Sequence, residues 1–218
     1  MDISNIDYTL YLVTDRKLMK GRDFLEVIDQ AVKGGVTVVQ LREKETTTRE
    51  FLDIGEKVIK LLRKRNVPLI INDRIDIALA LDSKGVHLGV HDLPIETARR
   101  ILGYDRIIGL SAENVEDALS ADKRGANYIG VSPIYTTPTK PELGKGLGIE
   151  GLKEIRKVTK LPLIAIGSLK ADNCREVIEN GADGIAVVSA ICSAPDPEKA
   201  AREICSEINK GKANKKRI

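Results

Sequence analysis

The chain has 218 residues, and 42% of them are hydrophobic, which is enough for the core of one large domain or two small ones. Its formal net charge of +3 is slight and its aromatic content is only 3%, so neither a basic face nor a stacking platform for nucleic acid is expected. The sequence contains no apolar run of roughly 18 residues and no signal-like N-terminus, which predicts a cytoplasmic protein without a membrane span.

Short apolar runs rich in β-branched residues recur along the chain, each followed by polar residues and then by a segment with helical periodicity. The runs with the length and composition of strands are 9–14, 36–41, 68–72, 85–90, 106–111, 128–134, 162–167 and 184–189. The segments between them repeat apolar residues every three or four positions. Several of these segments end at glycine, which suits the left-handed cap of a helix.

This alternation predicts the fold class. Strands that are apolar on both faces are typical of a parallel sheet that is covered on both sides. Eight β-α units within residues 1–210 predict a single α/β domain, a (β/α)8 TIM barrel, with a doubly wound open sheet as the alternative. Residues 211–218 carry clustered positive charge without apolar periodicity, which predicts a mobile and dispensable basic tail.

In such a barrel the carboxyl ends of the strands form the active-site face. Polar or backbone-exposing residues follow most of the predicted strands: Arg42, Glu43, Lys44, Asn72, Asp73, Asp92, Ser111, Thr137, Thr139, Lys140, Gly167, Ser168, Val188 and Ser189. We therefore expect these residues to converge on one rim. The long segment between the sixth strand and the next helix is rich in Pro, Gly and Thr, as ligand-binding loops often are.

Structural explanations remain open for several of these residues. Charges at strand ends often lie only where the chain returns to solvent. Asn72 and Asp73 are alternatively interpreted as the N-cap of the following helix, and Asp92 as a cap for the helix that begins near Pro94. We interpret His87, inside the fourth strand, as a hydrogen-bonded structural imidazole.

The residue types on the rim favour one chemistry. Two carboxylates on neighbouring strand ends, Asp73 and Asp92, form a hard oxygen site that suits Mg²⁺, which typically binds one or two carboxylates and substrate phosphates. The cationic side chains of Arg42, Lys44 and Lys140 would bind the same phosphates. The turns after the seventh and eighth strands mark a second phosphate subsite, built from backbone N–H groups. This pattern predicts a transferase that joins a diphosphate-activated donor to a phosphorylated acceptor.

The same residues lie in motifs of a known family. The segments VTVVQLREK, LIINDRIDIALA, GVHLGVHDLP, IIGLSAEN, YIGVSPIYTTPTK, LPLIAIGSL and GADGIAVVSAI, in this order, resemble the thiamine-phosphate synthase family over essentially the whole chain. The resemblance implies an alkyl transferase of thiamine biosynthesis that depends on Mg²⁺. Hydroxymethylpyrimidine would pass from its diphosphate to the nitrogen of a thiazole phosphate, giving thiamine phosphate and pyrophosphate. A carboxylated thiazole would also release CO₂.

The resemblance also assigns the site residues. It implies a pyrimidine-diphosphate site formed by Gln40, Arg42, Glu43, Lys44, Asn72, Ser111 and Lys140. It implies Mg²⁺ ligands at Asp73 and Asp92. It implies a thiazole-phosphate site at Thr137, Pro138, Thr139, Gly167, Ser168, Val188 and Ser189. The family usually has glycine where this chain has Ser168, a departure that bears on the affinity for the acceptor more than on activity.

Two other functions are compatible with a barrel of this kind. A thiazole tautomerase would share the thiazole-phosphate site, although such relatives tend to lose the diphosphate and metal residues. A barrel that only binds a phosphorylated ligand would share much of the rim. The expected partners are small-molecule substrates, and the sequence leaves assembly into a homo-oligomer open.

Overall fold

The computed structural model describes residues 5–136 and 146–215. Its strands are β1 Leu10–Val13, β2 Val38–Leu41, β3 Leu69–Asn72, β4 Gly85–Leu88, β5 Ile107–Ala112, β6 Tyr128–Val131, β7 Leu163–Ala165 and β8 Gly184–Val187. Each strand pairs in parallel with the next along the chain. Strand β8 pairs with β1 and closes the barrel. The predicted TIM barrel is therefore confirmed, and the open sheet is wrong because it would leave β1 and β8 unpaired.

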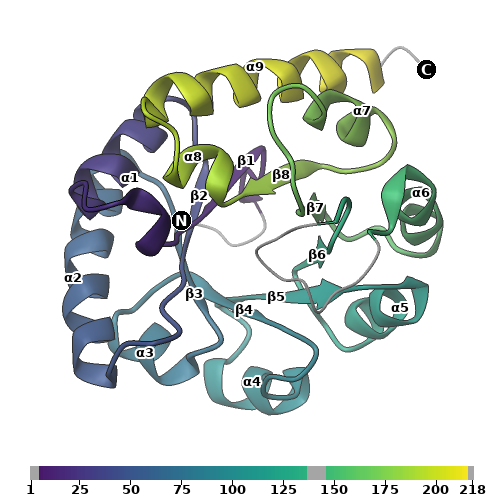
Figure 1. Ribbon diagram of the computed structural model, residues 1–218. Helices are drawn as coiled ribbons and strands as arrows, with labels where there is room; N and C mark the ends of the chain where they lie inside the picture. The colour runs from purple at the N-terminus through teal and green to yellow at the C-terminus, as the bar shows by residue number, and fades with distance from the viewer. Residues whose placement is uncertain (1–4, 137–145, 216–218) are drawn as a thin grey trace.

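Helices surround the strands as an outer ring (Figure 1). They are η2 Lys17–Met19, α1 Phe24–Lys33, α2 Thr48–Arg65, α3 Ile75–Ala80, α4 Ile95–Leu102, α5 Val115–Lys123, α6 Gly148–Val158, α7 Cys174–Glu179, α8 Ser189–Cys192 and α9 Pro197–Lys215. Within the described residues, no helix combines the length and the apolar character that a membrane crossing requires.

Local sequence explains where the outer helices begin. The Asp23 side chain accepts a hydrogen bond from the backbone N–H of Glu26 and caps α1. At the start of α2, Thr47 and Glu50 form a reciprocal capping box. Such caps satisfy backbone N–H groups that have no partner within the helix.

Each strand contributes to two separate cores, because successive side chains point to opposite faces. In β1, Leu10 and Leu12 pack outward into the layer between strands and helices. Tyr11 and Val13 point into the barrel, where they belong to a smaller cluster that includes Tyr128. Both faces are buried, which is why the strands read as continuous apolar runs in the sequence.

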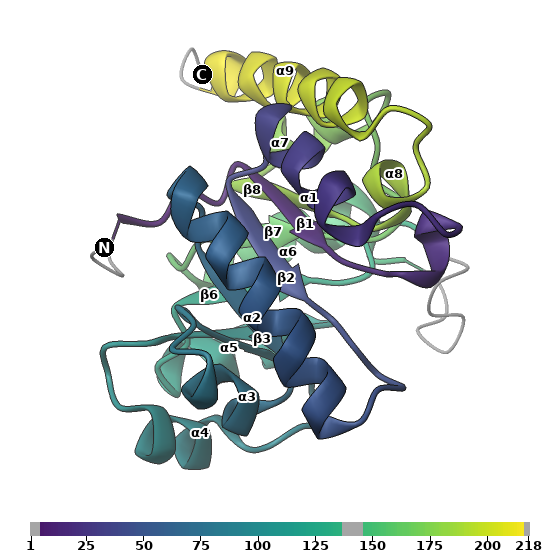
Figure 2. The ribbon, with the colours of Figure 1, turned by 90° about the vertical axis from the view of Figure 1, so that its left-hand side faces the viewer.

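The end of the chain differs from the predicted tail. Helix α9 continues through Lys215, so residues 211–215 belong to the barrel domain, and residues 216–218 lie outside the described part of the chain. Figures 1 and 2 show α9 lying beside α1 and α7.

Three contacts fix the last turns of α9. Gly211 is buried against α7, where an added Cβ would lie 3.0 Å from the Cβ of Ile178. Lys212 donates a hydrogen bond to the Thr9 hydroxyl at 2.5 Å. Asn214 Nδ2 lies 2.6 Å from a carboxylate oxygen of Glu179. Lys212 and Lys215, which contributed to the predicted tail, therefore lie on an anchored helix, and their charge alone gave no sign of these contacts.

We expect two truncations to separate the anchored turns from the residues beyond them. Ending the chain after Lys210 removes the contacts of Lys212 and Asn214 and should cost about 2 kcal/mol, since each hydrogen bond contributes about 1 kcal/mol. Tm should fall by about 4 to 8 °C. Ending the chain after Lys215 should leave Tm unchanged. Calorimetry of both proteins checks this, and equal melting temperatures would contradict the anchoring role.

Candidate functional site

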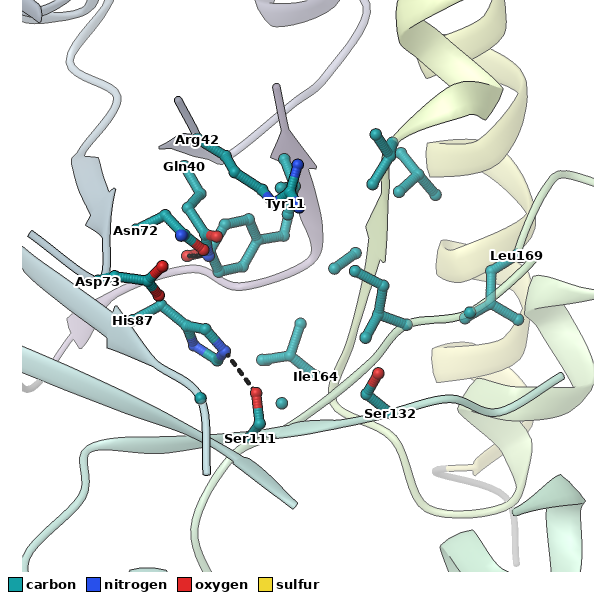
Figure 3. Close-up of a pocket in the computed structure, with 18 of the residues that line it drawn as sticks. Tyr11, Gln40, Arg42, Asn72, Asp73, His87, Ser111, Ser132, Ile164 and Leu169 are labelled. Carbon is teal, nitrogen blue, oxygen red and sulfur yellow. Dashed lines mark hydrogen bonds between the residues drawn. The ribbon is translucent and has the colours of Figure 1, made fainter. Parts of the chain in front are cut away.

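A pocket opens at the carboxyl ends of the barrel strands, on the rim where the sequence places the site (Figure 3). The predicted residues that line it are Gln40, Arg42, Lys44, Asn72, Asp73, Asp92, Ser111, Gly167, Ser168, Val188 and Ser189. The predicted residues Thr137, Pro138, Thr139 and Lys140 lie outside the described part of the chain. Glu43 is described but does not line the pocket.

The three adjacent charged side chains after β2 do not all point into the pocket. Arg42 and Lys44 line the pocket, whereas Glu43 between them forms a bidentate ion pair with Arg16, with N–O distances of 2.9 to 3.0 Å. The Glu43 side chain is only 7% exposed, so this pair fixes the loop after β2 against the loop after β1. The expectation that Glu43 binds in the pyrimidine-diphosphate site therefore finds no support in the geometry, because Arg16 occupies its carboxylate.

Asp73 and Asp92 come together from neighbouring strand ends. Lys44 forms an ion pair with Asp73, and the two carboxyl groups are close enough to hydrogen bond with each other. Burial acts to raise the pKa of Asp73, but the hydrogen bonds from Asp92 and Lys44 outweigh it and lower that pKa. The pKa of Asp92 is raised by burial and by the neighbouring Asp73. The pair is thus a concentrated acidic site with one cation, Lys44, beside it.

The structure does not support the capping interpretation of these carboxylates. Helix α3 begins after Arg74 and helix α4 after Pro94, and neither N-cap residue makes a side-chain capping hydrogen bond. Asp92 instead accepts the backbone N–H of Gly89 at 2.7 Å, which orients it within the loop after β4. Asp73 has a left-handed backbone with φ of 60°, a conformation that is costly for a residue with a Cβ and that recurs at functional sites.

A second group of backbone donors lies across the pocket, at the ends of β7 and β8. Gly167 has a φ of 120°, and an added Cβ there would lie 2.8 Å from the backbone nitrogen of Ile134, so glycine is required. The backbone N–H groups of Ser168 and Ser189 donate no hydrogen bond within the described part of the chain. Unpaired N–H groups at a turn and at a helix start suit a phosphate.

Ser168 ties this turn to the segment after β6. Its backbone is left-handed, with φ of 50°, and its hydroxyl donates to the Thr136 carbonyl oxygen at 2.7 Å. Asn173 donates to the Ser168 carbonyl oxygen at 3.0 Å. The serine that replaces the usual glycine therefore adds a contact that glycine would lack.

The floor of the pocket is a set of polar side chains inside the barrel. Gln40 Nε2 lies 3.0 Å from the Tyr11 hydroxyl, which lies 2.8 Å from the Tyr128 hydroxyl. His87 contacts Tyr128 through Nδ1 at 2.9 Å and Ser111 through Nε2 at 3.1 Å. Figure 3 shows the last of these bonds. The interpretation of His87 as a hydrogen-bonded imidazole is confirmed, and the structure adds that it lines the pocket.

Sequence reasoning missed the two tyrosines of this floor. Tyr11 and Tyr128 lie inside the predicted strands 9–14 and 128–134, and neither was singled out as a site residue. Alternation along each strand offers a signal, because a residue two positions from an inward-facing neighbour also faces inward. Tyrosine is scarce in this chain, and a buried hydroxyl needs a partner, so both positions could have been marked as interior polar sites.

Comparisons with known proteins agree with this geometry. The family model described as thiamine monophosphate synthase matches residues 10–191. The thiamine-phosphate synthase of Syntrophomonas wolfei subsp. wolfei is 50% identical over 200 residues, covering 92% of this chain and 96% of the relative. That of Clostridium novyi is 46% identical over 202 residues, covering 93% and 99%. The solved thiamine phosphate pyrophosphorylase of Pyrococcus furiosus is 39% identical, with a TM-score of 0.87 over 94% of this chain and 98% of that one.

The left-handed backbone of Ser168 generates a stability prediction. Ser168→Gly relieves the backbone cost of about 1 kcal/mol and loses a hydrogen bond of similar worth, so Tm should hardly change. Ser168→Ala loses the bond but keeps the backbone cost, so Tm should fall by about 2 to 4 °C. Thermal unfolding of the two variants checks this. A lower Tm for the glycine variant than for the alanine variant would contradict the account.

Proposed function

The chain belongs to the thiamine monophosphate synthase family, and from this premise we propose how its pocket carries out the reaction. Its function is that of a thiamine-phosphate synthase, a transferase of thiamine biosynthesis. We propose that it condenses hydroxymethylpyrimidine diphosphate with a thiazole phosphate, carboxylated or plain. The observation that supports this best is that one pocket combines two cationic side chains, a carboxylate pair and a separate backbone cradle.

In this proposal the diphosphate lies between β2, β3 and β4. Arg42 makes no ion pair within the described residues, so its guanidinium is available to an anion. Lys44 already pairs with Asp73 and would exchange that carboxylate for a phosphate oxygen when a cation binds beside it. Asn72, at the end of β3, adds amide donors close to the same oxygens.

The carboxylate pair fits a magnesium ion. Asp73 and Asp92 supply two hard oxygen ligands. Burial and the neighbouring Asp73 raise the pKa of Asp92, and a divalent cation would stabilise both carboxylates in their charged form. The described residues contain no group of three or more His, Cys, Asp or Glu that could hold a metal. Mg²⁺ commonly completes its shell with water and substrate phosphates. When bound, it would neutralise charge on the departing diphosphate.

The protein residues then act by charge and position. The bond between the pyrimidine methylene carbon and the diphosphate oxygen breaks, and its electron pair leaves with the diphosphate. The thiazole nitrogen donates its own pair to the methylene carbon and forms the new C–N bond. Arg42 and Lys44 hold the leaving diphosphate, while the Gly167–Ser168 turn and the start of α8 hold the thiazole phosphate. No protein nucleophile is required, since orientation and electrostatics carry the step.

The two alternative functions are not supported by the comparisons. The tautomerase reading leaves Arg42, Lys44 and the carboxylate pair without a role, and the binding-only reading is opposed by the close relatives named as synthases. Turnover of purified protein tests the proposal directly, with thiamine phosphate measured from the pyrimidine diphosphate and from each thiazole phosphate. Binding without product would contradict it. The cytoplasmic location and the state of assembly stay predictions from sequence.

Mutation of the carboxylates tests the metal site. Asp73→Asn and Asp92→Asn each remove one negative ligand, and each should lower turnover by about a hundredfold to a thousandfold, the usual cost of losing one electrostatic contact in the transition state. The Mg²⁺ concentration needed for half-maximal rate should rise. The double variant should resemble the worse single variant, because the second ligand has little left to hold once the metal is lost.

A matched control and a chelation arm complete this test. Asp53→Asn makes the same chemical change on the exposed face of α2, at a residue that does not line the pocket, and should leave turnover and its Mg²⁺ dependence unchanged. Chelating the metal should abolish turnover of wild type, and added Mg²⁺ should restore it. Normal rates in both single variants, with circular dichroism showing an intact fold, would remove these carboxylates from the metal site.

A further inference from the structure

A continuous chain of hydrogen bonds crosses the interior of the barrel beneath the pocket. It runs from Gln40 through Tyr11, Tyr128 and His87 to Ser111, with four contacts of 2.8 to 3.1 Å. The five residues come from β2, β1, β6, β4 and β5. The first and last members line the proposed pyrimidine-diphosphate site, so the three residues between them connect its two sides.

The chemistry of the members gives this chain one direction. The Nε2 amide nitrogen of Gln40 can only donate a hydrogen bond, so the Tyr11 hydroxyl accepts from it and donates a hydrogen bond to Tyr128. Among the described residues, Nδ1 of His87 is the acceptor that is left for the Tyr128 proton. A neutral imidazole that accepts at Nδ1 carries its proton on Nε2, which therefore donates to Ser111.

Each phenol in the chain has a single proton to give. Burial raises the pKa of Tyr11 and of Tyr128 far above neutral pH, so both hydroxyls stay protonated. Tyr11 and Tyr128 are each 1% exposed, so bulk water does not offer them alternative partners. If only one end of this series of hydrogen bonds reversed, at least one buried hydroxyl proton would be left without an acceptor.

Two glycines show that the barrel makes room for these rings. Gly109 in β5 faces Tyr128, and a Cβ there would lie 2.0 Å from the ring carbon Cζ. Gly130 in β6 faces His87, and a Cβ there would lie 2.9 Å from Cε1. Glycine weakens a strand interior and often marks a site of close approach. Here it permits the Tyr128 and His87 rings to lie nearly parallel, with centroids 5.5 Å apart.

We propose that Tyr11, Tyr128 and His87 are positioning residues that hold Ser111 as a hydrogen-bond donor toward the pocket. Because the Ser111 oxygen accepts from His87, its own proton is left for a ligand. Diphosphate oxygens can only accept hydrogen bonds, so a Ser111 hydroxyl that donates toward the pocket attracts them. If Ser111 donated to His87 instead, the lone pairs of its oxygen would face the anion and repel it. This inference deepens the proposed function and rests on Ser111 facing the diphosphate-bearing substrate.

At its other end the chain fixes the Gln40 amide. The side-chain nitrogen donates to Tyr11, and the side-chain oxygen Oε1 accepts no hydrogen bond within the described residues. That oxygen is left as an acceptor at the pocket, opposite to the donor at Ser111. The hydrogen-bond series thus determines, from within the barrel, that Gln40 offers an acceptor and Ser111 a donor to the pocket.

Nitrogen NMR of the histidines tests the direction without any turnover. The protein contains only two histidines, His87 and His91, so a sample labelled with ¹⁵N at histidine gives the signals of two imidazoles. The signals that remain in the His91→Gln variant belong to His87. In its neutral form, the His87 imidazole should carry its proton on Nε2 and none on Nδ1. A proton on Nδ1 would overturn the proposal even if the enzyme is fully active.

A mutant cycle tests the action through Ser111. Tyr128→Phe keeps the ring but cuts the chain, and it should mix the two tautomers of His87 and lower kcat/KM by about fivefold to tenfold, the worth of one hydrogen bond. Ser111→Ala should cost at least as much, and the double variant no more than Ser111→Ala alone. Tyr8→Phe is the matched control, since the ring centroids of Tyr8 and Tyr128 lie 5.0 Å apart but Tyr8 is not a member of the hydrogen-bond series from Gln40 to Ser111.

The control should change neither kcat/KM nor the His87 signals. Additive losses in the double variant would show that Tyr128 acts by a route other than Ser111 and would overturn the positioning role. If wild type shows the expected tautomer but makes no thiamine phosphate, the proposed function fails while the hydrogen-bond direction stands.

Discussion

The site depends on closure of the barrel, which is made by parallel pairing of β1 with β8. That pairing joins residues 10–12 to residues 185–187, from opposite ends of the chain. It brings the carboxyl ends of all eight strands to one rim and encloses an interior that each strand reaches with alternate side chains. Without closure, the cationic loop after β2 and the backbone N–H groups after β7 and β8 would not face each other.

Closure also creates an interior in which every buried polar group needs a hydrogen-bond partner. Some inward positions carry apolar side chains such as Val38, Ile70 and Ile164, but buried hydroxyls must find partners or lose about 1 to 3 kcal/mol each. Tyr11 and Tyr128 satisfy one another and extend to Gln40 and His87. The polar interior is therefore connected to the pocket, and the core and the binding site share residues.

The sequence alone was sufficient for the barrel because β-α alternation repeats along the whole chain, and it located most of the rim because strand ends converge in this fold. It gave no sign of side-chain partners that are distant in sequence. Glu43 was placed in the site beside Arg42 and Lys44, but its partner Arg16 lies 27 positions earlier. The clustered positive charge near the C-terminus likewise gave no indication that Lys212 contacts Thr9, a residue near the other end of the chain. Tyr128 was hidden because its role comes from Tyr11 and His87, which only the closed barrel brings near.

A structure of the protein with Mg²⁺, pyrophosphate and thiamine phosphate would show whether one pocket holds both halves of the reaction. We expect pyrophosphate against Arg42 and Lys44, with the cation between it and the pair Asp73 and Asp92. We expect the thiazole phosphate at the backbone N–H groups of Ser168 and Ser189. Pyrophosphate bound outside this pocket, or a cation that contacts neither carboxylate, would contradict the proposed function of this pocket.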